Sequence, residues 1–291
     1  MTTAISTRGL TKAYGEHRAV DGLDLDIQEG EVFALLGPNG AGKTTTVEIL
    51  EGFRTRDGGH VSVLGMDPHG ASRAWRDRIG IVLQTSGGLD LLTPREAIAS
   101  IARVYASPRD VDEVVAAVGL REKADDRIVG LSGGQRRRLD VGLGIIGRPE
   151  LLFLDEPTTG FDPQARRDFW ELIRGLAMDG TTILLTTHYL DEAEQLADRV
   201  GVIAGGRLLA LDTPESLGGR QGHDATVAWE EGGRRHSVRT ATPTAEVARI
   251  AARLAPGGEV PELTITRPSL EDTYLEMIAP HLVDDGQEVG A

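Results

Sequence analysis

The feature of this sequence that most constrains its fold is a glycine-rich loop between an apolar segment and a helical one. Residues 32–36 are all apolar, which predicts a strand buried on both faces. Residues 37–44 then read Gly-Pro-Asn-Gly-Ala-Gly-Lys-Thr, and residues 44–50 have helical character. This order of strand, glycine loop, lysine and helix matches a phosphate-binding loop. It predicts an α/β fold whose ligand lies at the end of this strand.

The loop has the residue types that phosphate binding requires. Glycines allow successive backbone N–H groups to point into one concavity at a helix N-terminus, where an anion is favoured. Lys43 is expected to reach the β- and γ-phosphates of a nucleotide, and the Thr44 hydroxyl to bind Mg²⁺. The residues predicted to bind the nucleotide here are Gly37, Pro38, Asn39, Gly40, Ala41, Gly42, Lys43, Thr44 and Thr45.

A second apolar strand ends in two carboxylates. Residues 151–154 predict a buried strand, and Asp155 and Glu156 follow it, at the end where open α/β sheets bind ligands. Alone, such a pair is more often a pair of exposed surface residues. After a phosphate loop, we interpret Asp155 as a Mg²⁺ ligand and Glu156 as the general base for a water that attacks the γ-phosphate.

The pentapeptide Leu-Ser-Gly-Gly-Gln at residues 131–135 is the most specific motif. Two glycines at a helix start predict a second anion site. Phosphate loop, this pentapeptide and a strand-end Asp-Glu, in this order, resemble the ATP-binding cassette (ABC) ATPases. The resemblance covers about residues 3–217. It implies that ATP lies between two cassettes in a head-to-tail dimer, held by the phosphate loop of one and by Ser132, Gly133, Gly134 and Gln135 of the other.

The resemblance also implies roles for single residues. Gln84 is in the position of a glutamine that contacts Mg²⁺ and water, and His188 in that of a histidine that holds the γ-phosphate and orients Glu156. Asp162 resembles an aspartate that reaches the partner subunit, and Tyr14 an aromatic residue that stacks on adenine. Phe161 stands where the family commonly has leucine, and we interpret it as tolerated packing.

The resemblance and the residue pattern together give the predicted organisation. We expect a P-loop NTPase (RecA-like) parallel sheet core with an N-terminal antiparallel β part, all within residues 1–217. A helical signature subdomain at about residues 86–147 is expected to receive the permease. Thr93 and Glu96 predict a capping box at its first helix. A composition break then predicts a small C-terminal α+β domain at residues 218–291, whose last helix is capped by Ser269 with Asp272.

Composition excludes several classes of protein. The formal net charge of −14 argues against nucleic-acid binding, and the absence of cysteine excludes disulfides and thiolate metal sites. We therefore interpret Arg136, Arg137 and Arg138 as a solvated helix face rather than a nucleic-acid patch. No apolar run approaches the roughly 18 residues needed to span a bilayer, and residues 1–10 lack the pattern of a signal peptide. These features predict a soluble chain, which the resemblance places at the cytoplasmic side of the membrane through a separate permease.

The C-terminal residues indicate a subgroup. Residues 267–275, Arg-Pro-Ser-Leu-Glu-Asp-Thr-Tyr-Leu, are similar to the ending of cassettes of the daunorubicin-resistance type, which serve drug exporters. The expected function is therefore ATP hydrolysis that drives drug export through separate transmembrane permease subunits. A lipid or polysaccharide exporter, or an ABC ATPase outside transport, is the alternative. A homodimer is expected, although pairing with a second, different cassette stays open.

Overall fold

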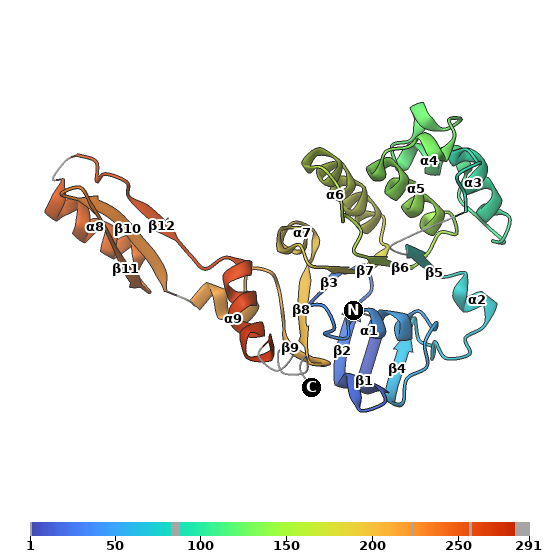
Figure 1. The fold of residues 1–291 in the computed structure, drawn as a ribbon, viewed down its shortest axis with the longest axis horizontal. Helices are drawn as coiled ribbons and strands as arrows, with labels where there is room; N and C mark the ends of the chain where they lie inside the picture. The colour runs from blue at the N-terminus through green and yellow to red at the C-terminus, as the bar shows by residue number, and fades with distance from the viewer. Residues whose placement is uncertain (1, 83–87, 223, 256–257, 283–291) are drawn as a thin grey trace, which may run out of the picture. The chain divides into compact units, whose positions relative to one another are not determined.

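The chain divides into two compact units, Met1–Leu211 and Asp212–Ala291, which are described separately. The computed structural model describes residues 2–82, 88–222, 224–255 and 258–282 (Figure 1). The boundary expected from the sequence, at residue 217, lies within the first residues of the second unit.

A six-stranded sheet forms the centre of the first unit, with strand order β5-β6-β7-β3-β8-β9 (Figure 1). Its strands are β3 (Val32–Leu36), β5 (Ile79–Val82), β6 (Leu151–Asp155), β7 (Thr182–Thr187), β8 (Arg199–Ala204) and β9 (Arg207–Asp212). Strands β5, β6, β7, β3 and β8 pair in parallel. All residues of β3 and β7 are buried, because a parallel sheet is covered on both faces. The predicted α/β core is confirmed.

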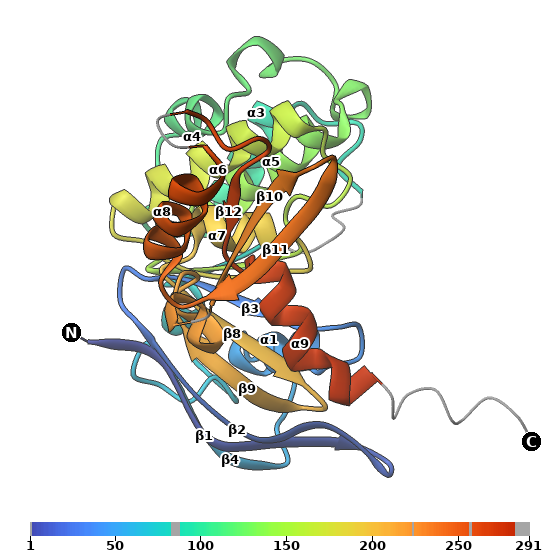
Figure 2. The same cartoon turned by 90° about the vertical axis from the view of Figure 1, so that its left-hand side faces the viewer.

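The first unit also holds a three-stranded antiparallel sheet, with two strands before β3 in the chain and one after it. It contains β1 (Thr3–Tyr14), β2 (His17–Gln28) and β4 (Gly58–Val63), in the order β2-β1-β4 (Figure 2). In β2, buried Leu23, Leu25 and Ile27 alternate with more exposed residues. This period of two is that of a sheet with one face on the core, as the sequence predicts.

Helices surround the central sheet and make up the segment that follows β5. Those around the sheet are α1 (Lys43–Leu50), α2 (Arg73–Arg76), α6 (Pro163–Met178) and α7 (Leu190–Leu196). The helical segment contains α3 (Pro94–Ala102), α4 (Val111–Ala117), η1 (Arg121–Lys123), η2 (Ile128–Gly130) and α5 (Gly133–Ile145). Thr93 and Glu96 form the predicted capping box at α3. The helical signature subdomain is thus present.

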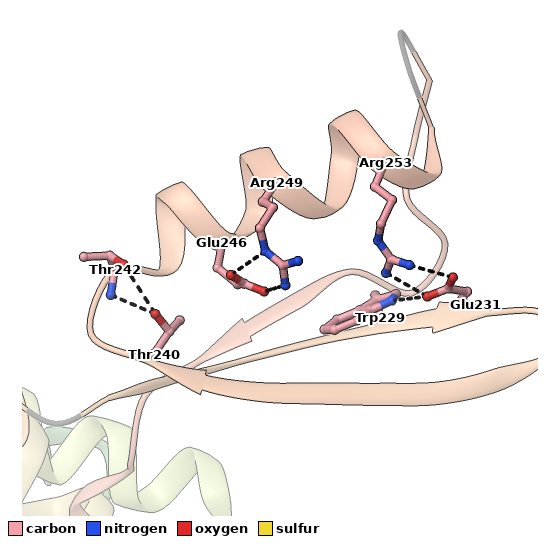
Figure 3. A network of polar contacts seen from close by, with 7 residues as sticks. All are labelled: Trp229, Glu231, Thr240, Thr242, Glu246, Arg249 and Arg253. Atoms are coloured by element: carbon pink, nitrogen blue, oxygen red, sulfur yellow. Dashed lines mark hydrogen bonds and ion pairs between the residues drawn. The ribbon is translucent and has the colours of Figure 1, made fainter.

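The second unit holds a small antiparallel sheet with a helix packed on it. Strands β10 (Ala225–Glu231), β11 (Arg234–Thr240) and β12 (Thr264–Thr266) run in the order β11-β10-β12. Helix α8 (Pro243–Leu254) covers the sheet, and Val227, Trp229 and Ile250 are the buried centre. Arg253 from α8 forms an ion pair with Glu231, whose carboxylate also accepts from the Trp229 indole (Figure 3).

The last helix of the second unit packs beside the 3-10 helix near the start of that unit. Helix α9 (Leu270–Leu282) contacts η3 (Leu217–Gly222), where a Cβ on Gly218 would lie 2.4 Å from Met277 Cε. The Ser269 hydroxyl accepts from the Asp272 amide and the Asp272 carboxylate accepts from the Ser269 amide, so the expected cap is present. Within the described part of the chain, no helix is both long enough and apolar enough to cross a membrane.

Candidate functional site

Three loops leave the central sheet at the same edge and form the candidate site. Strand β3 leads to the glycine loop, β6 to Asp155 and Glu156, and β7 to His188. Leu36 pairs with Thr187, and Asp155 pairs with Thr186, so the carboxyl ends of the strands lie level. Residues far apart in the sequence are therefore brought together, as parallel pairing requires.

Crowding of the backbone fixes the shape of the glycine loop. Gly42, the N-cap of α1, has a φ of 99°, and a Cβ there would lie 2.1 Å from the Ala19 carbonyl oxygen. A Cβ on Gly37 would lie 2.3 Å from the carbonyl oxygen of Ile203. Both positions exclude any side chain, because real Cβ atoms do not approach a backbone atom this closely.

Lys43 is held inside the loop rather than extended into solvent. Its Nζ donates to the carbonyl oxygens of Gly37 at 2.7 Å and Pro38 at 3.1 Å, and the residue is only 7% exposed. Burial lowers the pKa of the Lys43 ammonium, while the negative charges of Glu156 and Asp155 oppose that shift. The loop thus carries a fixed positive charge where phosphate oxygens are expected.

A cavity of about 260 Å³ joins the glycine loop to residues from elsewhere in the unit. It is lined by Tyr14, His17, Ala19, Asn39, Gly40, Ala41, Gly42, Lys43, Thr44, Thr45 and Glu156. Tyr14 is 42% exposed, and two cations lie near its ring, Arg54 at 5.3 Å and Lys12 at 5.7 Å from the centroid. The structure therefore brings Tyr14 and the phosphate loop to one hollow, with Glu156 at its border.

Hydrogen bonds connect the ends of β6 and β7. The Thr186 hydroxyl donates to Asp155 Oδ1 at 2.5 Å, and the Glu156 amide donates to the Thr186 carbonyl and hydroxyl oxygens, both at 3.1 Å. His188 Nδ1 lies 3.4 Å from Glu156 Oε1, and the His188 ring packs against Tyr189. Glu156 and His188 are thus close enough to act on one another, as expected from the sequence.

Asp155 and Thr44 offer oxygen donors suited to Mg²⁺. One carboxylate and one hydroxyl beside a phosphate site fit this ion, which takes few protein ligands and completes its shell with phosphate and water. In the described ranges, no group of three or more histidine or acidic side chains forms a complete metal cage. Gln84, the third predicted ligand and a predicted catalytic residue, lies outside the described residues.

The signature residues begin α5 and lie outside the lining of the cavity. The Ser132 hydroxyl accepts from the Gln135 amide, and Gln135 Oε1 accepts from the Ser132 amide, which makes a capping box. Gly134 is placed against α6, because a Cβ there would lie 3.1 Å from the Ala165 Cβ. The described structure therefore gives Ser132, Gly133, Gly134 and Gln135 no part in the cavity of their own chain.

Asp162 begins helix α6. Its carboxylate accepts from the amides of Gln164 and Ala165, both at 2.9 Å. Phe161 packs edge-to-face on the buried Phe169, with ring centroids 5.7 Å apart. Phe161 thus has a packing partner within this chain, and the expected role of Asp162 toward a second subunit stays a prediction.

The interpretation of all three arginines after the signature as a solvated face is wrong for Arg137. Arg137 is 7% exposed, and its guanidinium donates to the carbonyl oxygens of Asp155 and Pro157. Arg136 pairs with Asp90, and Arg138 with Asp168. The three residues are of the same type, but only Arg137 lies on the face of the helix that points toward the end of β6. The helical period is the signal that could have found it.

Sequence reasoning also missed a half-buried carboxyl near the site, that of Glu51. Burial raises the pKa of Glu51, at the end of α1, to about 8, and the negative charges of Asp155 and Glu48 add to the rise. Glu51 directly follows α1, whose residues are mostly polar, and nothing in the local sequence marks it as an inward-facing residue. Tertiary packing of α1 alone decides its environment.

Comparison with known proteins agrees with these motifs. The family model described as "ABC transporter" matches residues 20–159. The daunorubicin/doxorubicin resistance ATP-binding protein DrrA of Streptomyces peucetius is 45% identical over 221 residues, 74% of this chain and 67% of that protein. The chain belongs to the ABC transporter family. The resemblance seen in its motifs is thereby confirmed, and so are its expected nucleotide binding and ATPase activity.

Two further likenesses extend this assignment. The Nod factor export ATP-binding protein I of Neorhizobium galegae is 43% identical over 222 residues, 74% of this chain and 64% of that protein. Among solved structures, cbiO1 from Clostridium perfringens, part of the ABC transporter complex cbiONQ, has a TM-score of 0.68 and 26% identity. The likeness covers 74% of this ABC cassette and 90% of that chain.

Glu51→Gln is expected to change how the stability of this ABC cassette depends on pH. The unfolded carboxyl ionises near its ordinary value of 4.5, while the folded one keeps its proton to about 8. The folded state of the wild type therefore loses stability as pH rises from about 4.5 to 8, by on the order of 3 kcal/mol. Glutamine removes that loss. Urea denaturation at pH 5 and pH 8 measures it, and equal pH dependence of wild type and variant would contradict it. Exposed Glu171→Gln is the control.

Proposed function

We propose that this chain is the ATP-hydrolysing subunit of a drug exporter that works through a separate membrane permease. The observation that carries the proposal is the shared hollow of Tyr14, the phosphate loop and Glu156, with His188 3.4 Å from the Glu156 carboxylate. The 45% identity to a daunorubicin/doxorubicin resistance protein supports drug export. Identity of 43% to a Nod factor export protein favours export of a different cargo as the second candidate.

In the proposed mechanism, Tyr14 stacks on the adenine and the loop from Gly37 to Thr45 holds the phosphates. Glu156 accepts a proton from water as that water attacks the γ-phosphorus, and the bond to the β,γ-bridging oxygen breaks to release ADP. His188 orients Glu156 and donates a hydrogen bond to the γ-phosphate. Asp155, Thr44 and Gln84 are the proposed ligands of Mg²⁺, which when bound neutralises phosphate charge.

The proposed working unit is a head-to-tail dimer of two cassettes. The signature residues begin a helix and do not line the cavity of their own chain. This arrangement leaves Ser132, Gly133, Gly134 and Gln135 available to close over ATP on a partner, with Asp162 crossing the same interface. We expect two identical cassettes, peripheral at the cytoplasmic face of the membrane through the permease, and no nucleic-acid partner.

Glu156→Gln tests the hydrolytic step. Glutamine keeps the shape of the side chain but is not a base, so kcat is expected to fall by roughly 10²-fold or more. The variant should also accumulate as an ATP-bound dimer on size-exclusion chromatography. Exposed Glu171→Gln is the matched control and should retain the wild-type rate within about twofold. Wild-type turnover by Glu156→Gln would remove Glu156 from this role.

Export is tested in cells that express the chain with the permease encoded beside it. Together they should raise tolerance to daunorubicin, and the Glu156→Gln pair should not. Membrane fractions should hold the chain only when the permease is present. A chain that stays in the soluble fraction in both cases would contradict the exporter proposal, while tolerance unchanged despite membrane binding would favour a different cargo.

A further inference from the structure

One buried guanidinium holds the backbone on both sides of Glu156. Arg137 Nη2 donates to the Asp155 carbonyl oxygen at 2.7 Å, and Arg137 Nε donates to the Pro157 carbonyl oxygen at 3.1 Å. These two carbonyls belong to the residues immediately before and after Glu156. The side chain reaches them from α5, the helix that begins with the signature residues.

The backbone at Glu156 needs such support. Its φ of 43° lies in the left-handed region, which costs a residue with a side chain about 1 kcal/mol or more. A strained residue persists only when its surroundings fix it. Thr186 binds the Glu156 amide, and Arg137 binds the carbonyl groups on either side. Together these contacts set the direction in which the Glu156 carboxylate leaves the strand end.

The chemistry of arginine suits this position. A planar guanidinium presents several N–H donors in fixed directions, so that one side chain can reach two carbonyl groups, whereas a lysine ammonium is a compact charge on a flexible stem. Burial lowers the pKa of Arg137, and the negative charge of Asp140, whose carboxylate lies 3.9 Å away, opposes that shift most strongly. Burying a cation carries a cost in free energy, which the two carbonyl contacts and the nearby Asp140 carboxylate offset.

We propose that Arg137 is a positioning residue that aligns Glu156 and couples that alignment to the position of the signature helix. The proposal rests on the general-base role given to Glu156 above. Ser132 is the N-cap of α5, and Arg137 lies within the same helix. A movement of α5 therefore shifts both the signature residues and the contacts that Arg137 makes beside Glu156. In the head-to-tail dimer, the signature end contacts ATP held by the partner, while Arg137 acts on the base for ATP held by its own chain. Each cassette then transmits the closure of one ATP site to the other.

Arg137→Lys tests whether Arg137 aligns Glu156, and Arg138→Lys is the matched control on the same helix. Arg138 pairs with Asp168 on α6. A lysine at 137 keeps the charge but replaces two donors on separate nitrogens of a rigid plane with one ammonium on a flexible stem, so kcat is expected to fall at least about tenfold, because small misplacements of a catalytic group cost one to two orders of magnitude. KM for ATP and the melting temperature should stay near wild type. Arg138→Lys should retain its rate within about twofold. Wild-type kcat in Arg137→Lys would overturn the proposal.

A double-mutant cycle separates positioning from a general structural role. If Arg137 acts through Glu156, adding Arg137→Lys to Glu156→Gln should lower the residual turnover no further and should leave the ATP-trapped dimer intact. A further tenfold loss, or loss of the dimer, would overturn the proposal and assign Arg137 to the stability of the helix. If Glu156→Gln alone keeps wild-type turnover, the general-base role itself fails. If Arg137→Lys keeps wild-type turnover while Glu156→Gln loses it, the proposed role of Arg137 fails and the general-base role of Glu156 stands.

Discussion

Parallel pairing of β3, β7 and β6 is the constraint on which the candidate site depends. Leu36 lies opposite Thr187, and Asp155 opposite Thr186, so three loops leave the sheet at one level. None of these loops could hold its residues in place alone, because each spans only a few residues between a strand and a helix. Fully buried strands fix their starting points to within hydrogen-bonding register. The phosphate loop, the proposed base Glu156 and His188 are thereby brought together from segments about 150 residues apart in the sequence.

Much of this arrangement could be predicted from the sequence, because each part has a local signal. Apolar runs mark the buried strands, glycine with lysine marks the phosphate loop, and the capping box at Thr93 marks a helix start. Residue type alone did not predict the burial of Arg137 or the raised pKa of Glu51, although the helical period of α5 carries a signal for Arg137. Charge predicts exposure in general, and the packing of α5 against β5 and of α1 against β2 and β4 sets the surroundings of these two side chains. Local pattern gives the type of an element, whereas tertiary contact gives the environment of a single side chain.

The second unit has only a small apolar centre to stabilise it. Its sheet has one narrow apolar centre of Val227, Trp229 and Ile250, while β11 is mostly exposed. Ion pairs such as Arg253 with Glu231 surround that centre and contribute little each, because water screens them (Figure 3). The strands and helices were predictable as elements. The similarity of residues 267–275 to a subgroup of cassettes concerns the start of α9 and the turn before it.

The crowding around the glycine loop has a consequence for affinity. The carbonyl groups of Ala19 and Ile203 lie so close to Gly42 and Gly37 that neither position has room for a side chain. The neighbouring segments therefore fix the curvature of the loop. The conformational entropy of ordering these residues is then lost when the protein folds, not when a nucleotide arrives. A preorganised cradle of this kind therefore loses little conformational entropy when a nucleotide binds, which raises its affinity above that of a flexible loop of the same composition.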